Sequence, residues 1–480
     1  MATIATPSNE KEDKVVALKI LVDREKNKVV FAEAGKDFVD ALLSFLTLPI
    51  GTIVRLVGNE SSIHSVRVGS LSTLYESVAN LEEKHLWTPH CKEMLLQPRN
   101  SMEAYCQQLK LNIDDTEPIK FFVCDKHLDC RRKNGSLLST FRNQRCRCGK
   151  LMSGVISTRN LTLENGFVEE TATFIISDDL SVLPNDVGIS GLLQKHGIDN
   201  MEALVEQTVD ISKEEVVDLL KFALLSNTPM TDFILKKEQS LDNFNRGNQS
   251  QFEIRKVPSD EGRQMVVKLI IRKSNKKVLF AEAKEDFVDF LFSFLTFPLG
   301  GVLHMLEGFS SLRCVDKLYK SVIELCSDRY LSSQALKDKL AKPQCALQFK
   351  LSNQILPIGE ACLPVFHSYT YTYNLNTYEV NSELKFVDPK SSTGELSSSR
   401  GFVKGPSMYM VTDDLAVTPL SSIATVSYLN RSKVSLSDLE ETVLSIGLKE
   451  GLSILKASLT STSALTNGLN QYMETIKEEN

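Results

Sequence analysis

Short runs of aliphatic and β-branched residues alternate with polar turns at the start of the chain. Residues 16–23 (VALKILVD) and 28–34 (KVVFAEA) are two such runs, and the polar turn REKN joins them. β-Branched residues bounded by turn residues are typical of paired strands. Apolar residues then recur at helical spacing, with Asp37 in the position of an N-cap, until Leu48 and Pro49. The pattern therefore predicts a strand pair followed by a helix that proline ends.

The remaining segments of the first half mix strands with helices. A helix is predicted over residues 71–83, strands over 120–124 and 168–177, and helical segments over 201–225. Strands followed by grouped helices are typical of α+β folds, whereas a doubly wound sheet would need regular alternation of the two. We therefore expect an α+β fold.

The pattern of the first half returns in the second half. FAEAGKDFVDALLSFLTLPIG, starting at Phe31, is matched by FAEAKEDFVDFLFSFLTFPLG, starting at Phe280, with 15 of 21 positions identical. LYESV and ISDDLSVLP follow in the first half, and LYKSV and VTDDLAVTP follow in the same order in the second. An internal repeat of this kind predicts two tandem copies of one module, each a small sheet with packed helices.

The repeat sets the expected domain boundaries. These are a disordered tail at 1–14, module copy one at 15–235, a linker at 236–264, module copy two at 265–465 and a second tail at 466–480. The linker is assigned from its polar composition. A second polar loop, DPKSSTGELSSSRG, interrupts copy two at residues 388–401. The sequence leaves open how the modules pack against each other and which oligomeric state they form.

Composition and charge narrow the class of protein. A chain of 480 residues with a hydrophobic fraction of 42% can fill two or three cores. Its net charge of −6 gives no general attraction to nucleic acid or to an anionic membrane. From the polar start of the chain we expect no secretory signal, and the longest apolar runs fall short of the ~20 residues that span a bilayer. We expect a soluble cytoplasmic or nuclear protein with protein partners and no membrane association.

Four of the ten cysteines form the one constellation with clear chemical content. Cys124, Cys130, Cys146 and Cys148 lie in FFVCDKHLDCRRKNGSLLSTFRNQRCRCGKLM. In a reducing compartment, clustered thiols bind metal more often than they form disulfides. Two ligand pairs separated by a loop suit tetrahedral zinc, and a closed four-ligand shell leaves no position for a reacting water. The sequence predicts a structural zinc site in a zinc-ribbon-like insertion of copy one.

The spacing of these cysteines leaves alternatives open. Cys-x5-Cys and Cys-x-Cys replace the commoner Cys-x2-Cys pairs, and His127 could take the place of Cys130 as the fourth ligand. The four residues could also be simple reduced cysteines. Copy two carries only Cys345 and Cys362 in the corresponding region, so no such metal site is expected there.

The cysteine-rich segment is also strongly basic. Residues 120–150 contain nine Lys or Arg and two Asp, a local balance of +7. These cations either balance thiolate charge and stay solvated, or they contact phosphates of a nucleic acid. In the second interpretation the contacts would come from Arg131, Arg132 and Lys133.

Repeated carboxylates offer a further alternative, an enzyme with an unrecognised carboxylate site. Glu33, Asp37 and Asp40 recur in copy two, and Asp178-Asp179 follows a predicted strand. Carboxylates at a helix start favour its free amides, and Asp after a strand commonly forms a turn, so structural roles are favoured. The chain has none of the common nucleotide or metalloprotease motifs, and the sequence identifies no catalytic or cofactor-binding residue.

The motifs DFVDALLSFLTLPIG, LYESV, CRCGKLM and DDLSVLP give the chain a family resemblance. It resembles the plant-specific proteins grouped as domain-of-unknown-function family 674, over roughly residues 15–235 and 266–465. The resemblance implies a land-plant source and a cysteine segment ending in CxCGK, here Cys146–Lys150, and it implies no activity. The leading hypothesis is a non-enzymatic interaction or scaffold protein with a structural zinc site. A nucleic-acid-binding protein and an enzyme are the alternatives.

Overall fold

The structure is a computed structural model of the chain. It describes residues 14–59, 65–126, 130, 137–156, 165–186, 200–235, 263–362, 364–372, 377–396 and 400–479, together with isolated positions between 187 and 199. The tail expected at 1–14 and the linker expected at 236–264 lie almost wholly outside the described residues. Below, the first half means residues 14–235 and the second half residues 263–479.

A five-stranded antiparallel sheet lies in the first half. Along β1, Leu18, Ile20 and Val22 are buried while Lys19 is exposed, because successive side chains of a strand point to opposite faces. A bulge interrupts the pairing of β1 with β2 after Leu21. In spatial order the strands are β8 (Val182–Pro184), β7 (Phe174–Ser177), β2 (Lys28–Ala34), β1 (Val16–Asp23) and β9 (Leu204–Ile211).

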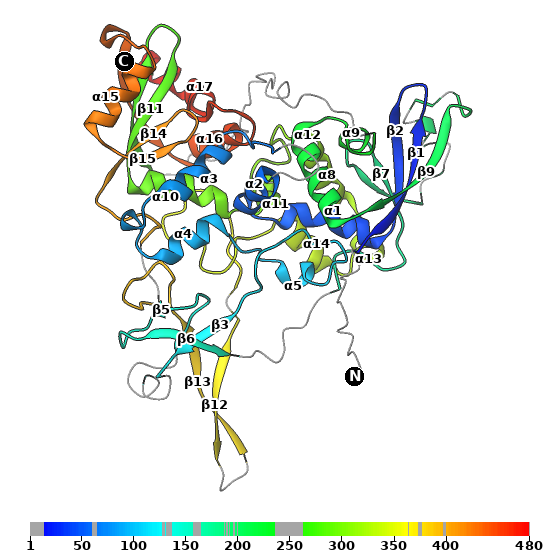
Figure 1. The fold of residues 1–480 in the computed structure, drawn as a ribbon, viewed down its shortest axis with the longest axis horizontal. Helices are drawn as coiled ribbons and strands as arrows, with labels where there is room; N and C mark the ends of the chain where they lie inside the picture. The colour runs from blue at the N-terminus through cyan, green and yellow to red at the C-terminus, as the bar shows by residue number, and fades with distance from the viewer. Residues whose placement is uncertain are drawn as a thin grey trace, which may run out of the picture.

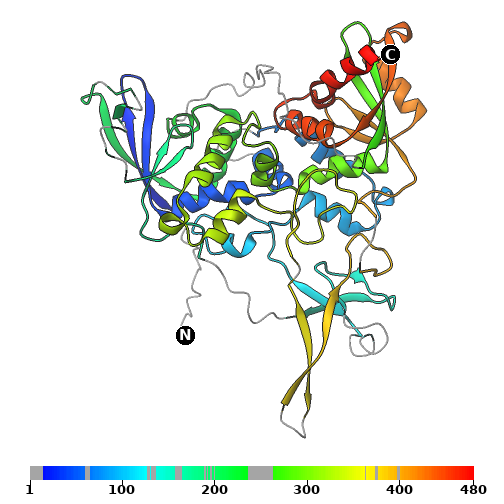
Figure 2. The ribbon, with the colours of Figure 1, turned by 180° about the vertical axis from the view of Figure 1, so that it is seen from behind.

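The second half contains a sheet with the same strand order and the same antiparallel pairing. Its central hairpin also carries a bulge, after Ile270. Figures 1 and 2 show the two sheets at opposite ends of the molecule, with helices between them. The strands are β15 (Val417–Pro419), β14 (Met408–Thr412), β11 (Lys277–Lys284), β10 (Met265–Arg272) and β16 (Leu439–Ile446).

Most of the helices lie between the sheets, whereas the helix Ser422–Arg431 packs on the outer face of the second sheet. In the first half they are α1 (Lys36–Thr47), α2 (Ile50–Gly58), α3 (Leu71–Asn80), α4 (Pro89–Leu96), α5 (Glu103–Cys106), α8 (Lys213–Leu225) and α9 (Pro229–Ile234). In the second half they are α10 (Glu285–Ser293), α11 (Leu299–Met305), α12 (Arg313–Glu324), α13 (Ser327–Tyr330), α14 (Gln334–Ala341), α15 (Ser422–Arg431), α16 (Leu448–Thr460) and α17 (Ala464–Glu479).

Two segments differ from the sequence-based expectation. Residues 204–211, expected to be helical, form the edge strand β9, which pairs with β1 along its whole length, and the helix begins only at Lys213. Ser212 ends the strand because its side chain and that of Glu215 cap the helix reciprocally. Residues 466–479, expected to be a tail, belong to α17, which buries Leu469 and Met473 against the core.

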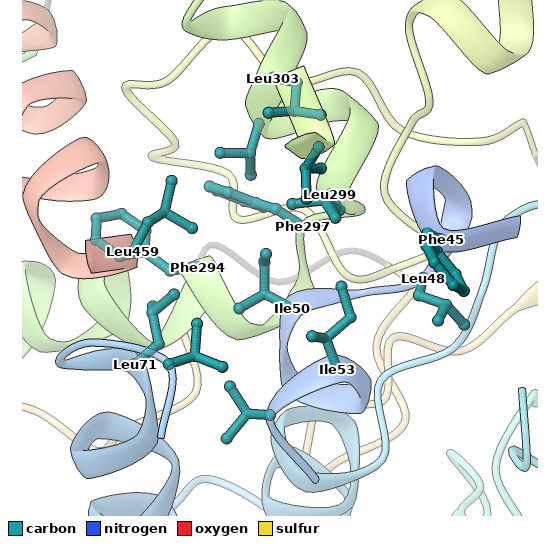
Figure 3. Close-up of a cluster of buried hydrophobic side chains, with 14 of the residues drawn as sticks. Phe45, Leu48, Ile50, Ile53, Leu71, Phe294, Phe297, Leu299, Leu303 and Leu459 are labelled. Atoms are coloured by element: carbon teal, nitrogen blue, oxygen red, sulfur yellow. The ribbon is translucent and has the colours of Figure 1, made fainter. Parts of the chain in front are cut away.

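One hydrophobic core runs through both halves. Figure 3 shows Ile50 and Ile53 of α2 beside Phe294, Phe297 and Leu299 of the second half. At its centre Pro49 and Pro298 form a bridge: the Ile50 amide donates to the Phe297 carbonyl and the Leu299 amide to the Leu48 carbonyl, each at 2.9 Å. Each proline ends the helix that precedes it. The two helix ends therefore lie side by side in the core.

Each half also contacts the edge strand of the other half's sheet. In α3, the Ser77 hydroxyl accepts a hydrogen bond from the Val417 amide of β15 at 3.0 Å. In α12, the Ser321 hydroxyl accepts one from the Val182 amide of β8 at 2.9 Å. Equivalent helices thus contact the edge strand of the opposite half, so the two halves pack against each other reciprocally.

A smaller subdomain projects from this body and combines strands of both halves (Figures 1 and 2). One three-stranded sheet has the order β12 (Phe366–Thr372), β13 (Thr377–Phe386) and β4 (Leu137–Leu138), and the other has the order β3 (Phe121–Cys124), β6 (Leu151–Ile156) and β5 (Gln144–Arg145). Mutual backbone hydrogen bonds between Phe122 and Ser139 join the two sheets. The predicted cysteine insertion lies in this subdomain.

Candidate metal centre

The four predicted ligands come from three short elements of the subdomain. Cys124 ends β3, and Cys130 follows after a turn. Cys146 and Cys148 lie in the connection between β5 and β6, whose residues Arg145 and Leu151 pair in register. Since β6 pairs with β3 on its other side, the sheet brings both cysteine pairs to one end.

The structure brings all four cysteines together. Their sulfur atoms lie within 4.8 Å of one another. The Sγ–Sγ distance is 3.5 Å between Cys124 and Cys148 and 3.6 Å between Cys130 and Cys146. Four sulfurs around a tetrahedral ion at a metal–sulfur distance of about 2.3 Å would be separated by about 3.8 Å. The cluster therefore has the size that a four-thiolate metal site requires.

Backbone amides support the sulfur atoms in a regular way. The amide two residues further along donates to three of the sulfurs: Lys126 to Cys124, Cys148 to Cys146, and Lys150 to Cys148. Gly149, with φ of +83°, permits the tight turn in which its own amide donates to the Cys146 carbonyl at 2.8 Å. Amide donors of this kind stabilise thiolates and orient them toward a shared cation.

The pKa values of the cysteine thiols differ within the cluster. Burial raises the pKa of Cys124 to about 11 and raises the pKa of Cys146 further. A hydrogen bond from Cys130 lowers the pKa of the exposed Cys148 to about 7. Thiols this close oppose one another's ionisation, so four thiolates require a cation between them.

Hydrophobic side chains surround the cluster. Cys124, Cys130 and Cys146 pack among Phe122, Leu137, Met152 and Val387, and Leu396 lies against them. Three of the four cysteines are buried. A set of four cysteines in such a setting could hold a zinc ion with all four positions filled, which is the arrangement of structural sites.

Two predictions lie outside the described residues. His127, the alternative fourth ligand, is one, and the nucleic-acid contacts Arg131, Arg132 and Lys133 are the other. Cys130, which His127 could replace as the fourth ligand, lies within the sulfur cluster.

Six other cations of the basic segment are described, and one of them, Lys120, pairs with Glu117 at 2.8 Å. Lys126, Arg142, Arg145 and Lys150 are exposed, and no carboxylate of the described residues forms an ion pair with them. Arg147 differs because its Nε donates to the Gly394 carbonyl at 3.1 Å. The surface of the cysteine subdomain therefore carries four exposed cations that form no ion pair within the described residues.

The carboxylates considered as an enzymatic site have separate partners. Glu33 accepts a hydrogen bond from Asn185, and Asp37 lies 3.7 Å from Lys110 in the first turn of α1, where it follows the N-cap Gly35 instead of forming the N-cap. Among the described residues, neither belongs to a group of three or more metal-ligating side chains.

Buried Asp40 has a structural partner, and its counterpart Asp289 has an equivalent one. One oxygen of Asp40 accepts the amides of Phe167 and Val168, both at 2.9 Å. One oxygen of Asp289 accepts the amides of Phe402 and Val403, at 2.7 and 2.9 Å. These carboxylates anchor loops, which agrees with a structural interpretation although not with the helix-start position expected for Asp40.

Asp178 and Asp413 anchor helices in the same way. The Asp178 carboxylate accepts the Thr231 amide at 2.8 Å at the start of α9, and the Asp413 carboxylate accepts the Thr466 amide at 2.8 Å at the start of α17. Burial raises the pKa of both carboxyls. A perturbed pKa at a helix start is here a consequence of packing.

The second half offers no comparable cysteine cluster within its described residues. Cys345 is buried in the main core, and Cys362 is exposed. What sequence reasoning missed is the environment of the cluster: Gln144 and the loop from Val387 to Leu396 lie against it. No local pattern marks the loop, because it is polar and lies more than 200 positions from the cysteines.

Fold and site together define a mixed α/β protein of small antiparallel sheets with a four-cysteine cluster that could bind a metal ion. The chain belongs to the family described as "Protein of unknown function (DUF674)", whose sequence model matches residues 12–449. No curated protein and no solved structure matches the chain. Within the described residues, every helix is too short or too polar to cross a bilayer.

Proposed function

We propose that this protein is a non-enzymatic interaction or scaffold protein, built from two related modules, in which a structural zinc ion holds the cysteine subdomain of the first module together. The observation that carries the proposal is the convergence of Cys124, Cys130, Cys146 and Cys148. When bound, zinc would hold all four sulfurs as thiolates and crosslink β3 to the β5–β6 turn. It would contribute on the order of 10 kcal/mol to folding of this region.

The proposal of a scaffold rests on what the site can do chemically. Four cysteine ligands fill the shell of a tetrahedral ion, so no position is left for a substrate or an activated water. The partners proposed are therefore proteins bound at the surface, and the compartment proposed is the cytoplasm or nucleus, where thiols stay reduced. The module boundaries proposed are 15–235 and 265–465, with a linker between them.

The experiment is elemental analysis of the purified full chain. We expect one zinc per chain in the wild type and none in the double variant Cys146→Ser, Cys148→Ser. The matched control is Cys326→Ser, Cys362→Ser, which removes two exposed cysteines outside the cluster and should keep the zinc. A wild-type protein that is folded, reduced and free of zinc after dialysis against micromolar zinc would refute the metal centre.

The exposed cations without an ion pair favour a second candidate, binding of nucleic acid by the basic cysteine-rich loop. Each phosphate bound by a cation makes the affinity more sensitive to salt, and removing one such cation reduces the log–log slope by about one unit. We expect Arg142→Glu, Arg145→Glu, Lys150→Glu to weaken salt-dependent retention of an RNA oligonucleotide. Charge reversal at Arg131, Arg132 and Lys133 should weaken it as well.

A matched control for this test reverses three exposed lysines elsewhere, at Lys317, Lys433 and Lys449. It changes the net charge of the chain by the same amount, so any general electrostatic effect appears in both triple variants. Equal retention of the two triple variants, or no retention of RNA by the wild type at low salt, would exclude this candidate.

A further inference from the structure

A polar loop of the second half is buried beside the cysteine cluster of the first. Its composition, DPKSSTGEL, is typical of a solvent-exposed loop, yet only 7% of Asp388, 3% of Lys390 and 1% of Ser391 is exposed. The flanking residues Val387 and Leu396 pack into the same hydrophobic cluster as Cys130 and Cys146. We call residues 387–396 the clasp loop.

Side chains of the cysteine subdomain hold the clasp loop by its backbone. The Gln144 amide nitrogen donates to the carbonyls of Asp388 and Ser391, both at 3.0 Å. Arg147 donates to the Gly394 carbonyl from the turn between the two cysteines. All three bonds come from the β5–β6 segment, which also carries two of the proposed metal ligands.

The closest approach is between backbones. Gly394 has φ of +77°, and a Cβ atom added to it would lie 2.6 Å from the Arg147 nitrogen and 2.9 Å from the Cys146 carbonyl carbon. Glycine is therefore required for two reasons, the left-handed conformation and the contact. The clasp loop lies directly on the backbone of a ligand residue.

Docking of the clasp loop also buries charge. The Lys390 ammonium lies 3.3 Å from the Asp388 carboxylate and donates to the Gln348 carbonyl at 2.7 Å. Removing an ion pair from water costs free energy that only well-placed partners offset. The docked loop is therefore sensitive to disorder in the surface that receives it.

We infer that the metal centre of the first half is a latch for the clasp loop of the second half: metal binding and loop docking stabilise each other. The inference rests on the proposed zinc site and names what that site regulates, the attachment of one half's loop to the other half's subdomain. Zinc would order the β5–β6 segment, which carries Gln144, Cys146 and Arg147, and this segment receives the loop. Coupling between two binding events is reciprocal. If zinc strengthens docking of the clasp loop by some factor, disrupting the docked loop must weaken zinc binding by the same factor.

The first test measures hydrogen exchange on the full-length protein with zinc and after chelation. The informative amides are those of Asp388, Ser391 and Glu395, which are hydrogen-bonded inside the docked loop. We expect chelation to speed their exchange tenfold or more while the amides of β10 and β11 keep their rates. Unchanged exchange in the loop, with zinc present beforehand at one per chain, overturns the latch and leaves the metal centre intact.

The second test measures zinc affinity by competition with a chromophoric chelator. Gly394→Ala should weaken the affinity for zinc at least fivefold, although residue 394 is not a zinc ligand. Gly58→Ala is the matched control, because nothing lies within 4 Å of a Cβ added there. Gln144→Ala loosens the loop without backbone strain and should act in the same direction. Wild-type zinc affinity in both loop-directed variants overturns the latch, whereas absence of zinc from the wild type overturns the metal centre itself.

Discussion

The Ser77 hydroxyl accepts a hydrogen bond from the Val417 amide across the boundary between the two halves. Ser321 and Val182 repeat this contact in the opposite direction. Each serine hydroxyl accepts a buried amide of an edge strand in the other half. Replacing the serine by alanine leaves that amide without a hydrogen-bond acceptor. We predict that Ser77→Ala and Ser321→Ala each lower the free energy of unfolding by about 1–3 kcal/mol.

Denaturant unfolding measures this effect. The exposed Ser422, at the start of α15, provides the control, and Ser422→Ala should stay within about 0.5 kcal/mol of the wild type. If the two buried serines behaved like Ser422, these hydrogen bonds between the halves would not contribute to stability.

The shared core predicts how the halves behave as separate chains. Because hydrophobic side chains of both halves meet around Pro49 and Pro298, each half alone would expose a large apolar surface. We expect chains 1–243 and 250–480 to associate into a stable 1:1 complex when co-expressed, and each to aggregate or self-associate when expressed alone. Size-exclusion chromatography with light scattering distinguishes these states, and two soluble, folded monomeric halves would contradict the prediction.

Part of this arrangement could be predicted from sequence, and part could not. The cysteines could be singled out because ligand chemistry restricts residue type and spacing. The reciprocal contacts of Ser77 and Ser321 could not, since an internal repeat is equally compatible with separate modules and with modules that pack against each other. Residues 204–211 were misassigned because β9 gains its stability from pairing with β1, a contact that local pattern does not contain.

The clasp loop shows a different limit of sequence reasoning. Polar composition usually indicates exposure to solvent, because buried polar groups need partners. Here the partners of Asp388 and Ser391 come from Gln144, in the other half of the chain. The cluster of four cysteines was therefore predictable while the surface that encloses it was not.

Gly69 marks a second close approach between the halves. It has φ of +43°, and an added Cβ atom would lie 2.8 Å from the carbonyl carbon of Leu459, at the end of α16. We predict that Gly69→Ala lowers the free energy of unfolding by about 2 kcal/mol or more, through backbone strain and displacement of α16. Gly35→Ala, with nothing within 4 Å, is the control, and thermal unfolding of the two variants is the measurement. Equal melting temperatures would contradict the prediction, because α16 would then move aside without loss of stability.

Asp40 and Asp289 accept equivalent pairs of amides but differ in charge environment. Lys36 lies 2.9 Å from Asp40, whereas the corresponding residue beside Asp289 is Glu285. Burial raises the pKa of Asp289 from 3.8 to about 7, the two amides lower it, and the Glu285 and Asp286 carboxylates raise it. Between pH 3.8 and about 7, Asp289 keeps its proton in the folded protein but loses it in the unfolded chain. The contribution of Asp289 to stability is therefore present at acid pH and is lost as the pH rises toward 7.

This difference predicts opposite effects of two asparagine substitutions. Asp289→Asn keeps an oxygen for both amides and cannot ionise, so it should raise the free energy of unfolding at pH 7.5 by on the order of 1 kcal/mol and lose this advantage toward pH 5. Asp40→Asn leaves Lys36 with two carbonyl acceptors, those of Asn165 and Val168, but without its carboxylate partner, and should destabilise by about 1–3 kcal/mol at pH 7.5. Because burial raises the pKa of Asp40 too, the wild-type protein gains stability toward acid pH, and this loss should grow there. Urea unfolding at pH 5.0, 6.0 and 7.5 compares the variants. Parallel pH profiles for wild type and Asp289→Asn would mean that Asp289 ionises in the folded protein as readily as in the unfolded chain.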